Sequence, residues 1–188
     1  CFHLGDYIYL IDVGGSYKRL TELNGGLYYD SKDFKTFTFN PFKMAYRHES
    51  SGKWYPTKNA LGREEEEDGS VVEFLATLVL SLWYRQTKVE IPVQTKELIK
   101  DSIKLFYNYV NESPVGKEVV VNFDSYFKFI IEDFNKELKS KDIDKKSFDV
   151  QQFSIMCKAF IIGGEYELLL NAETHVSLEN RWVCFDLE

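Results

Sequence analysis

The chain has 188 residues, and its 23 Lys and Arg against 30 Asp and Glu give a net charge of −7. Hydrophobic residues make up 44% and aromatic residues 16% of the sequence, which excludes a disordered chain and predicts a well-filled core. No continuous apolar run reaches the length of a membrane span, and we expect no signal peptide. The three cysteines lack a C-x-x-C spacing, which favours a reducing compartment.

The charge is unevenly distributed along the chain. Residues 1–60 carry 8 basic and 6 acidic groups, net +2, so residues 61–188 carry −9. A surface that binds a polyanion needs the opposite sign over most of its extent. We therefore expect no direct nucleic-acid binding by this chain, although the sequence leaves open a local basic patch around Lys43–Lys58.

The first forty residues have an α/β pattern. A short apolar run, Tyr7–Ile11, is followed by Asp12 and then by two glycines, as is typical of a central parallel strand. Ser16 is the predicted cap of a helix that ends before Gly25-Gly26. The apolar stripe of this helix consists of Tyr17, Leu20 and Leu23. Two further strands are predicted at Leu27–Tyr29 and Thr36–Phe39.

Residues 43–69 are predicted to form a long surface loop, because they are polar and interrupted by Gly and Pro. This stretch contains the acidic run Glu64–Asp68. Carboxylates that follow one another directly do not converge on one ion, so a solvated run is favoured over a cation site.

Four amphipathic helices are predicted between residues 70 and 163. Their expected caps or first residues are Ser70, Thr95, Asp124 and Ser147. A short helical turn at Glu165–Leu170 and a final strand near Trp182–Asp186 follow. The predicted helical core consists of Phe74, Leu78, Leu82, Ile103, Phe106, Ile130, Phe134, Phe153 and Phe160. This order predicts a helical subdomain inserted between pieces of an α/β sheet.

Few residues carry a recognisable chemistry. The phosphate-binding signature G-x-x-x-x-G-K-[ST] does not occur in the sequence, and the histidines His3, His48 and His175 have no ligand-like spacing. Cys157 lies on an apolar helix face and is expected to be a small core residue. Asp12 and Asp186 each end an apolar strand, where an acid can hold Mg²⁺ or orient water in nucleotide hydrolases. The alternative is a strand end that simply meets water.

Several motifs in order resemble the conjugative-transfer ATPases of type IV secretion systems, in particular the Bacteroides-type TraG/TraC conjugation ATPases. The N-terminal motifs are Leu10-Ile-Asp-Val-Gly-Gly-Ser-Tyr-Lys-Arg-Leu20, Leu23-Asn-Gly-Gly-Leu-Tyr-Tyr29 and Phe39-Asn-Pro-Phe42. The later motifs are Glu73-Phe-Leu-x-x-Leu-x-Leu-x-Leu-Trp83, Phe160-x-x-Gly-Gly-Glu-Tyr166 and Leu168-Leu-Leu-Asn171. Together they cover almost the whole chain.

The resemblance implies a partial RecA-like P-loop ATPase core, at the edge of a parallel sheet, with a mostly α-helical inserted subdomain. Its expected parts are residues 1–42 in the core, 43–69 as surface loop, 70–171 as helical insertion and 172–188 as the strand returning to the core. Asp12 matches the acid near the nucleotide in related motors and is the candidate catalytic residue. Ser16 and Tyr17 match the motif without an assigned contact.

The resemblance implies a larger parent protein, a motor that powers DNA transfer or pilus assembly, of which this chain is an internal fragment. The parent would bind ATP and Mg²⁺, form oligomers such as hexamers, contact secretion-apparatus proteins, and act in the cytoplasm at the inner face of the bacterial inner membrane. The family's phosphate loop is expected before residue 1 and its Mg²⁺-associated strand after residue 188. We therefore expect this chain alone to bind no cofactor or metal and to be inactive. The alternative is a non-enzymatic helical protein-interaction module.

Overall fold

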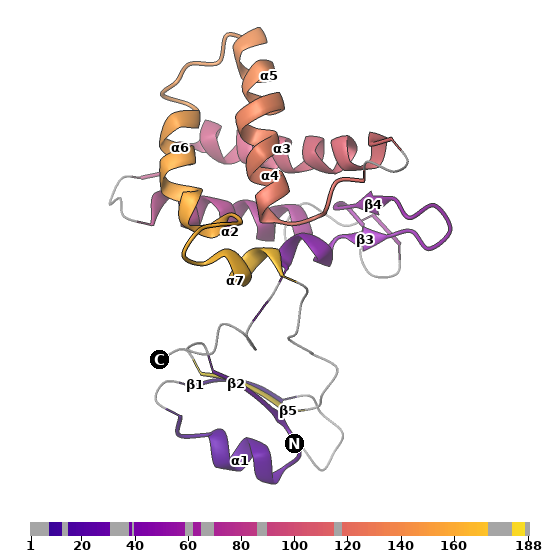
Figure 1. Cartoon of the computed structure of the whole chain (residues 1–188), viewed down its shortest axis with the longest axis vertical. Helices are drawn as coiled ribbons and strands as arrows, with labels where there is room; N and C mark the ends of the chain where they lie inside the picture. Colours follow the sequence, from indigo (N-terminus) through magenta and orange to yellow (C-terminus); the bar gives the residue numbers. More distant parts are fainter. Residues whose placement is uncertain are drawn as a thin grey trace. The chain divides into compact units, whose positions relative to one another are not determined.

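The structure, a computed structural model, describes residues 8–12, 15–30, 38, 40–58, 62–64, 70–85, 90–114, 118–172 and 182–186. The chain divides into two compact units (Figure 1). Unit 1 comprises Cys1–Asn40 together with Leu168–Glu188, and unit 2 is Pro41–Glu167. The parallel sheet belongs to unit 1 and the long helices to unit 2. The division into parts at residues 42, 69 and 171 stays a prediction.

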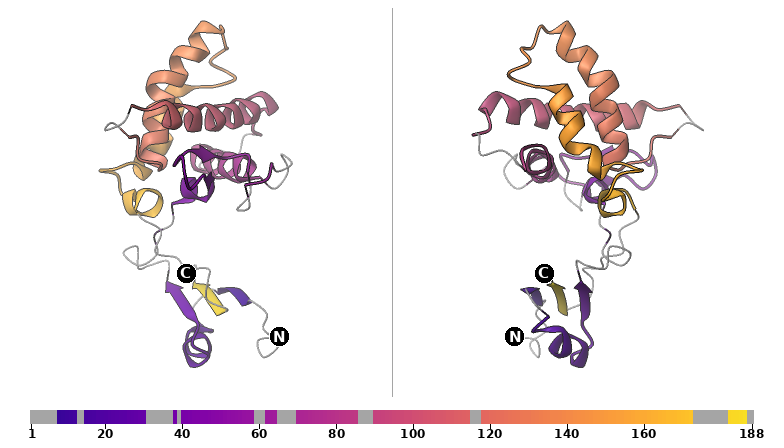
Figure 2. Two further views of the ribbon diagram at one scale, coloured as in Figure 1. Left: turned by 90° about the vertical axis from the view of Figure 1, so that its right-hand side faces the viewer. Right: turned by 60° about the vertical axis from the view of Figure 1, so that its left-hand side comes forward.

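In its described residues, unit 1 is built on three parallel strands. Their order is β1 (Ile8–Asp12), β5 (Trp182–Asp186) and β2 (Leu27–Asp30), so the strand from the end of the chain lies between the two N-terminal ones, as Figure 2 shows. Among the described strands β1 is therefore an outer strand, whereas its apolar run predicted a central one. Of the predicted strand at 36–39 only Thr38 is described, and it belongs to no strand.

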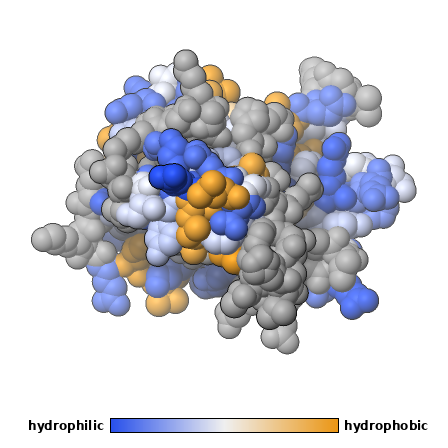
Figure 3. Space-filling view, turned by 90° about the horizontal axis from the view of Figure 1, so that it is seen from below, coloured by the Kyte–Doolittle hydropathy of each residue, from blue (hydrophilic) through white to orange (hydrophobic). Residues whose placement is uncertain are grey.

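A short helix, α1 (Lys18–Leu23), packs against β2 and β5. The prediction of Ser16 as its cap is wrong: the N-cap residue is Tyr17, and the Tyr17 side chain makes no capping hydrogen bond. The predicted apolar stripe is also wrong as a buried face, since Leu20 is 44% and Leu23 75% exposed, while the buried residue of the helix is Thr21. Figure 3 looks at the molecule from the side of α1 and shows hydrophobic surface directly beside strongly hydrophilic surface.

Two Gly-Gly pairs end helical segments, one in each unit. Gly25 and Gly163 have left-handed backbones, with φ of 67° and 87°, and a Cβ at either would meet open space. Their neighbours are constrained by contact instead. A Cβ on Gly26 would lie 2.7 Å from the Trp182 carbonyl oxygen, and one on Gly164 would lie 2.5 Å from the Ala159 carbonyl oxygen.

Unit 2 contains the predicted helices (Figure 1). Helix α2 (Val71–Tyr84) packs against α3 (Val93–Glu112), α4 (Phe123–Phe129) contacts α3, and α6 (Val150–Cys157) contacts α2. A π-helical turn, Ile130–Phe134, joins α4 to α5 (Asn135–Ser140), so the third predicted helix is continuous but locally widened. A 3₁₀ turn, Lys158–Phe160, extends α6, and α7 (Glu167–Asn171) follows.

The helix caps agree with the sequence at one position and differ at three. Ser70 caps α2 as predicted, because its Oγ accepts the Glu73 N–H at 3.3 Å. Helix α3 begins two residues before Thr95, with Pro92 as its N-cap. Helix α4 is capped by Asn122 and not by Asp124, and α6 by Asp149 and not by Ser147. In both cases the N-cap is another polar residue, two positions away from the one that the sequence pattern predicted.

The core of unit 2 is largely aromatic. Six of the nine predicted core residues are buried: Ile103, Phe106, Ile130, Phe134, Phe153 and Phe160. Leu78 and Leu82 are half-buried, and Phe74 is 42% exposed, so its assignment to the core is wrong. The centre is occupied instead by Phe42, which is fully buried among the rings of Phe106, Phe123 and Tyr126.

The segment predicted as a surface loop contains regular structure where it is described. A 3₁₀ turn, Pro41–Met44, leads into an antiparallel hairpin of β3 (Tyr46–Arg47) and β4 (Trp54–Tyr55). Further on, Lys58 and Glu64 form an isolated bridge and an ion pair of 3.6 Å. Most of the acidic run at 64–68 lies outside the described residues.

Candidate functional site

All three strands of the parallel sheet end in an aspartate. The strand register aligns Asp12 of β1 with Asp186 of β5, and Asp186 with Asp30 of β2. Residues in register on parallel neighbours point to the same face, and neighbouring strands lie about 4.8 Å apart. Asp12 and Asp186 are nearly inaccessible, at 6% and 5% exposure. The carboxyl edge of the sheet therefore carries two buried carboxylates side by side, at the edge where open α/β sheets bind ligands.

Asp12 is held by the start of α1. Its Oδ2 accepts the backbone N–H of Tyr17, the N-cap residue of α1, at 2.8 Å. Gly15, with φ of 73°, provides the left-handed residue in the turn between the strand and the helix. The Asp12 carboxylate thus has one established structural role, and its position at the strand end, predicted from the sequence, is confirmed.

Asp186 is held by a tyrosine from the neighbouring strand. Its Oδ2 accepts the Tyr28 hydroxyl at 2.5 Å. Burial raises the pKa of Tyr28 above its ordinary value, and the hydrogen bond to Asp186 and the negative charge of Asp186 raise this pKa further. The phenol therefore keeps its proton and remains a hydrogen-bond donor. A Cβ on Gly15 would lie 3.6 Å from the Tyr28 hydroxyl and 3.7 Å from Asp186 Oδ2, so this turn lies directly against the pair.

A thiol completes this part of the sheet. Cys184 lies two residues before Asp186 and aligns with Leu10 and Tyr28 in the strand register. Burial raises the pKa of Cys184, and the nearby charges of Asp12 and Asp186 act in the same direction. The thiol is therefore neutral at physiological pH and is not a nucleophile.

The structure thus brings together Asp12 and Asp186, which the sequence singled out separately, and adds Tyr28. The tyrosine was missed because its contact joins residues 158 positions apart, and nothing in either local motif signals that pairing. Of the other motif residues, Ser16 is exposed, and Tyr17 contributes its backbone N–H while its ring is 44% exposed. Carboxylates placed in this way can accept hydrogen bonds from water or from metal-bound water. In the described parts of the chain no three His, Cys, Asp or Glu residues are arranged to hold a metal ion.

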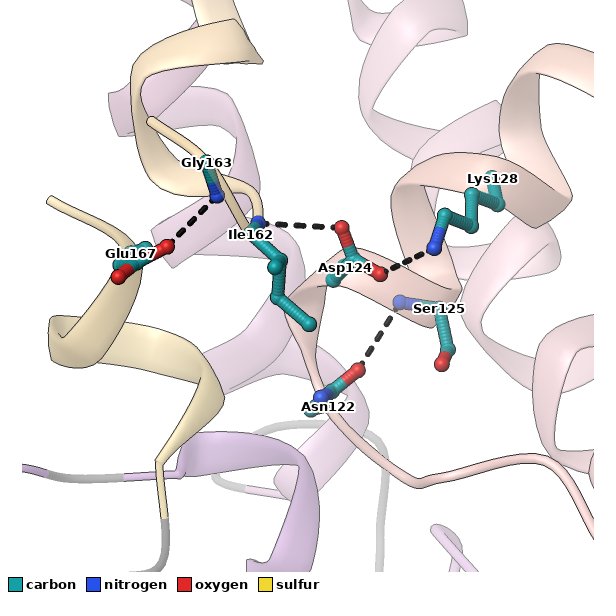
Figure 4. Close-up of polar contacts among 7 residues, drawn as sticks. All are labelled: Asn122, Asp124, Ser125, Lys128, Ile162, Gly163 and Glu167. Carbon is teal, nitrogen blue, oxygen red and sulfur yellow. Dashed lines mark hydrogen bonds and ion pairs between the residues drawn. The ribbon is translucent and has the colours of Figure 1, made fainter. Parts of the chain in front are cut away.

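A further buried carboxylate, Asp124, lies in unit 2, and its contacts are structural (Figure 4). Its Oδ1 accepts the Ile162 N–H at 3.1 Å, and its Oδ2 accepts from Lys128 Nζ at 2.6 Å. Beyond Ile162, the N–H of Gly163 donates to Glu167 Oε2 at 2.6 Å. Asp124 and Glu167 therefore fasten the turn after α6 from both sides. Cys157, beside this turn, is buried as predicted, and burial raises the pKa of its thiol to about 12.

Among the described residues, no helix is both long and apolar enough to cross a membrane. The chain matches the protein family described as the TraG P-loop domain over residues 1–188. No curated protein matches the chain.

Among solved structures, the chain is similar to VirB4 of Thermoanaerobacter pseudethanolicus, with 16% sequence identity and a TM-score of 0.58. The similarity covers 99% of this chain and 43% of that chain, so the chain spans less than half of the VirB4 structure. The likeness confirms the predicted fold class: part of a RecA-like α/β core with a small parallel sheet, accompanied by a mostly helical part.

Proposed function

The chain belongs to the family of the TraG P-loop domain, and from this we propose that it is an internal part of a conjugation or type IV secretion motor ATPase that powers DNA transfer or pilus assembly. In this proposal unit 1 is one edge of the motor's nucleotide-binding core, and the helices are an insertion in it. The phosphate loop of the motor is expected before residue 1.

The observation that supports this proposal most directly is the buried carboxylate at the end of β1. Asp12 lies at the carboxyl edge of a parallel sheet, 6% exposed, beside a second carboxylate on the adjacent strand. Water-orienting and Mg²⁺-associated acids of nucleotide motors occupy this kind of position. We assign Asp12 the role of accepting a hydrogen bond from the attacking water or from a Mg²⁺-bound water when the parent protein holds ATP.

The further expectations concern the assembled parent. It is expected to form oligomers such as hexamers, to contact other proteins of a secretion apparatus, and to act in the cytoplasm at the inner face of the bacterial inner membrane. Residues 1–188 contain no G-x-x-x-x-G-K-[ST], so this chain alone has no such loop to hold the β and γ phosphates and is expected not to hydrolyse ATP.

The test is Asp12→Asn in the full-length parent protein. Asn still accepts the Tyr17 N–H, so the start of α1 and the free energy of unfolding are expected to stay unchanged. A positioned group that acts in proton transfer is worth about 10²–10⁴-fold in rate, so turnover is expected to fall by that order while nucleotide affinity changes little.

The matched control is Asp30→Asn, the same substitution at the same register level on β2, which is expected to leave turnover unchanged. The isolated 188-residue chain, assayed beside the parent with ATP and Mg²⁺, gives the baseline without a phosphate loop. An Asp12→Asn parent with full stability and full turnover would leave the cap of α1 as the whole role of this residue.

A further inference from the structure

Tyr28 reaches the carboxyl edge of the parallel sheet from the middle of β2. In the strand register it aligns with Cys184 of β5, two residues before Asp186. Residues two apart on a strand point to the same face, so Tyr28, Cys184 and Asp186 share one face of the sheet. The Tyr28 side chain covers the step between the two levels, and its hydroxyl donates to Asp186 Oδ2 at 2.5 Å. The Asp186 carboxylate is therefore held from the neighbouring strand.

The surroundings of this hydrogen bond carry charges of both signs. Lys18 Nζ, from the start of α1, lies 5.4 Å from the centroid of the Tyr28 ring. Burial and the hydrogen bond to Asp186 raise the pKa of Tyr28 most, and the charge of Asp12 adds to this shift. Asp12 on β1 is thus close enough to act on the Tyr28 hydroxyl. We call Asp12, Asp186 and Tyr28 the edge cluster.

The two carboxylates of the edge cluster are oriented by donors from different elements. Asp12 Oδ2 accepts the Tyr17 N–H at the start of α1, whereas Asp186 Oδ2 accepts the Tyr28 hydroxyl of β2. Since neighbouring strands lie about 4.8 Å apart, a single water molecule can donate one O–H to each carboxylate. The lone pairs of such a water point away from both carboxylates. This is the orientation that a water needs in order to attack a phosphoryl group beyond the sheet edge.

We propose that Tyr28 is a positioning residue of the nucleotide site, and that its hydroxyl holds Asp186 as a second acceptor for the water that Asp12 orients. The inference rests on the proposed function of Asp12 and extends it, because Tyr28 acts only through Asp186. Two acceptors fix both O–H directions of a water, whereas a water bound to one acceptor rotates about its single hydrogen bond. Orientation of a reacting group is a direct contribution to the rate.

The alternative is that the Tyr28–Asp186 bond only ties β2 to β5. The two strands are already paired over four register positions, from Leu27 to Asp30, without any side-chain bond. A bond with a purely structural role would contribute to the free energy of unfolding and would leave the rate of the folded protein alone. The contact of Lys18 needs the Tyr28 ring and not its hydroxyl. Tyr28→Phe therefore removes the donor and retains the ring.

The experiment measures steady-state ATP hydrolysis by the full-length parent protein and its variants. Tyr28→Phe is expected to lower kcat about tenfold, the rate equivalent of one hydrogen bond to a charged group, and to change KM for ATP less than about twofold. Asp186→Asn is expected to lower kcat at least as much. The double variant is expected to be no slower than Asp186→Asn alone, because a residue that acts through another adds nothing once its partner is changed.

The pH dependence of kcat separates positioning from stability, since loss of folded protein would scale the rate equally at every pH. Removing the Tyr28 donor favours the protonated form of Asp186. Turnover of Tyr28→Phe is therefore expected to fall off at a pH about one unit higher than in the parent. The other titratable groups around the bond are the same in both proteins: Asp12 of β1, Asp30 of β2, Cys184 of β5 and Lys18 of α1.

The matched control is Tyr29→Phe, the same change on the next residue of β2, which points to the opposite face of the sheet. It is expected to retain the parental kcat and pH profile. The proposal is overturned if Tyr28→Phe keeps both, if the effects of Tyr28→Phe and Asp186→Asn add, or if Tyr29→Phe gives the same loss. If Tyr28→Phe does not fold, Asp186→Asn decides, and parental turnover in that variant overturns the proposal.

Asp12→Asn, assayed beside these variants, separates the two proposals. If Asp12→Asn slows turnover and Tyr28→Phe does not, this inference fails and the proposed function stands. If Asp12→Asn keeps full turnover, both fail, because the water shared by the two carboxylates then has no role in the reaction.

Discussion

Phe134 and Phe74 show how differently two phenylalanines of the same predicted core are placed. Phe134 is 2% exposed, stacks with Phe129 at 6.3 Å between ring centroids, and meets the edge of Phe148 at 5.4 Å. Phe74 lies on the outer side of α2 and is 42% exposed. The two residues therefore differ in the volume of protein that would have to rearrange if the ring were removed.

We predict that Phe134→Ala lowers the free energy of unfolding by about 3–5 kcal/mol, through lost burial and the cavity left behind. Phe74→Ala is expected to cost less than about 1 kcal/mol, because the ring is largely solvated already. Urea denaturation of both variants, followed by far-UV circular dichroism, measures the difference. Equal costs for the two substitutions would contradict the placement of α2.

The sequence did not distinguish these residues because α2 is apolar around most of its circumference. Three of its residues with exposed or half-buried side chains, Val71, Phe74 and Leu78, are spaced at helical intervals, and so are the residues that are in fact buried. The buried residues are Val72, Leu75, Ala76, Val79, Leu80 and Trp83. A stripe is identified by polar residues on the opposite face, and α2 has too few of them. In α3, which carries many charges, the predicted core residues Ile103 and Phe106 are indeed fully buried.

At the scale of an element, the start of α6 depends on one carboxylate. Asp149 Oδ1 accepts the N–H groups of Gln151 and Gln152, each at 3.0 Å. Ser147, the cap that the sequence predicted, donates its hydroxyl to Gln94 Oε1 and offers its carbonyl to Thr95 Oγ1. Its side chain therefore connects the turn before α6 to α3 and does not cap α6.

We predict that Asp149→Ala lowers the free energy of unfolding by about 0.5–2 kcal/mol, the usual cost of losing an N-cap. Ser147→Ala is expected to cost less, since it removes one exposed hydrogen bond and leaves the backbone bond to Thr95 in place. The readout is the urea midpoint of each variant. If Ser147→Ala proves the more costly, the cap lies where the sequence pattern put it.

Elements whose geometry depends on distant residues were beyond the sequence pattern. The β3–β4 hairpin has strands of two residues each, and it is tied to α3 through Asn111, 57 positions away from Trp54. The π-helical turn at Ile130–Phe134 keeps the hydrophobic spacing of an ordinary helix, so the periodicity does not reveal it. By contrast, β1 with Asp12 at its end, and the Ser70 cap, are local patterns, and these were predicted correctly.

For the molecule as a whole, buried tyrosine hydroxyls and a buried cysteine thiol make the free energy of unfolding depend on pH in the alkaline range. Burial raises the pKa of Tyr107 and Tyr126 above the ordinary 10.0 and the pKa of Cys157 from 9.0 to about 12. The Tyr107 hydroxyl donates to the Phe42 carbonyl, and the Tyr126 hydroxyl is 2.6 Å from Ser102 Oγ. The folded protein therefore retains protons that the unfolded chain releases.

Since the folded-state pKa values are raised, this stability is fully present below the unfolded pKa values and is lost as the pH rises above them toward the raised folded-state values. We predict that the free energy of unfolding falls between about pH 9 and pH 11, by up to about 1.4 kcal/mol per pH unit for each group. Urea midpoints at a series of pH values measure the slope, and Tyr126→Phe is expected to reduce it because one titrating group is removed. A flat profile, or a slope that Tyr126→Phe leaves unchanged, would contradict this linkage.

The two Gly-Gly pairs carry a consequence for mutational tolerance. Within each pair the first glycine is required by its dihedral angle alone, so Asn or Asp, which adopt left-handed backbones at modest cost, are acceptable replacements at Gly25 and Gly163. The second is required by the volume of a single methyl group against a carbonyl oxygen, so Gly26 and Gly164 accept no other residue without displacing backbone. In a saturation mutagenesis library selected for folding, two adjacent glycines would thus show opposite substitution profiles. The first position would accept Asn and Asp, and the second would remain Gly.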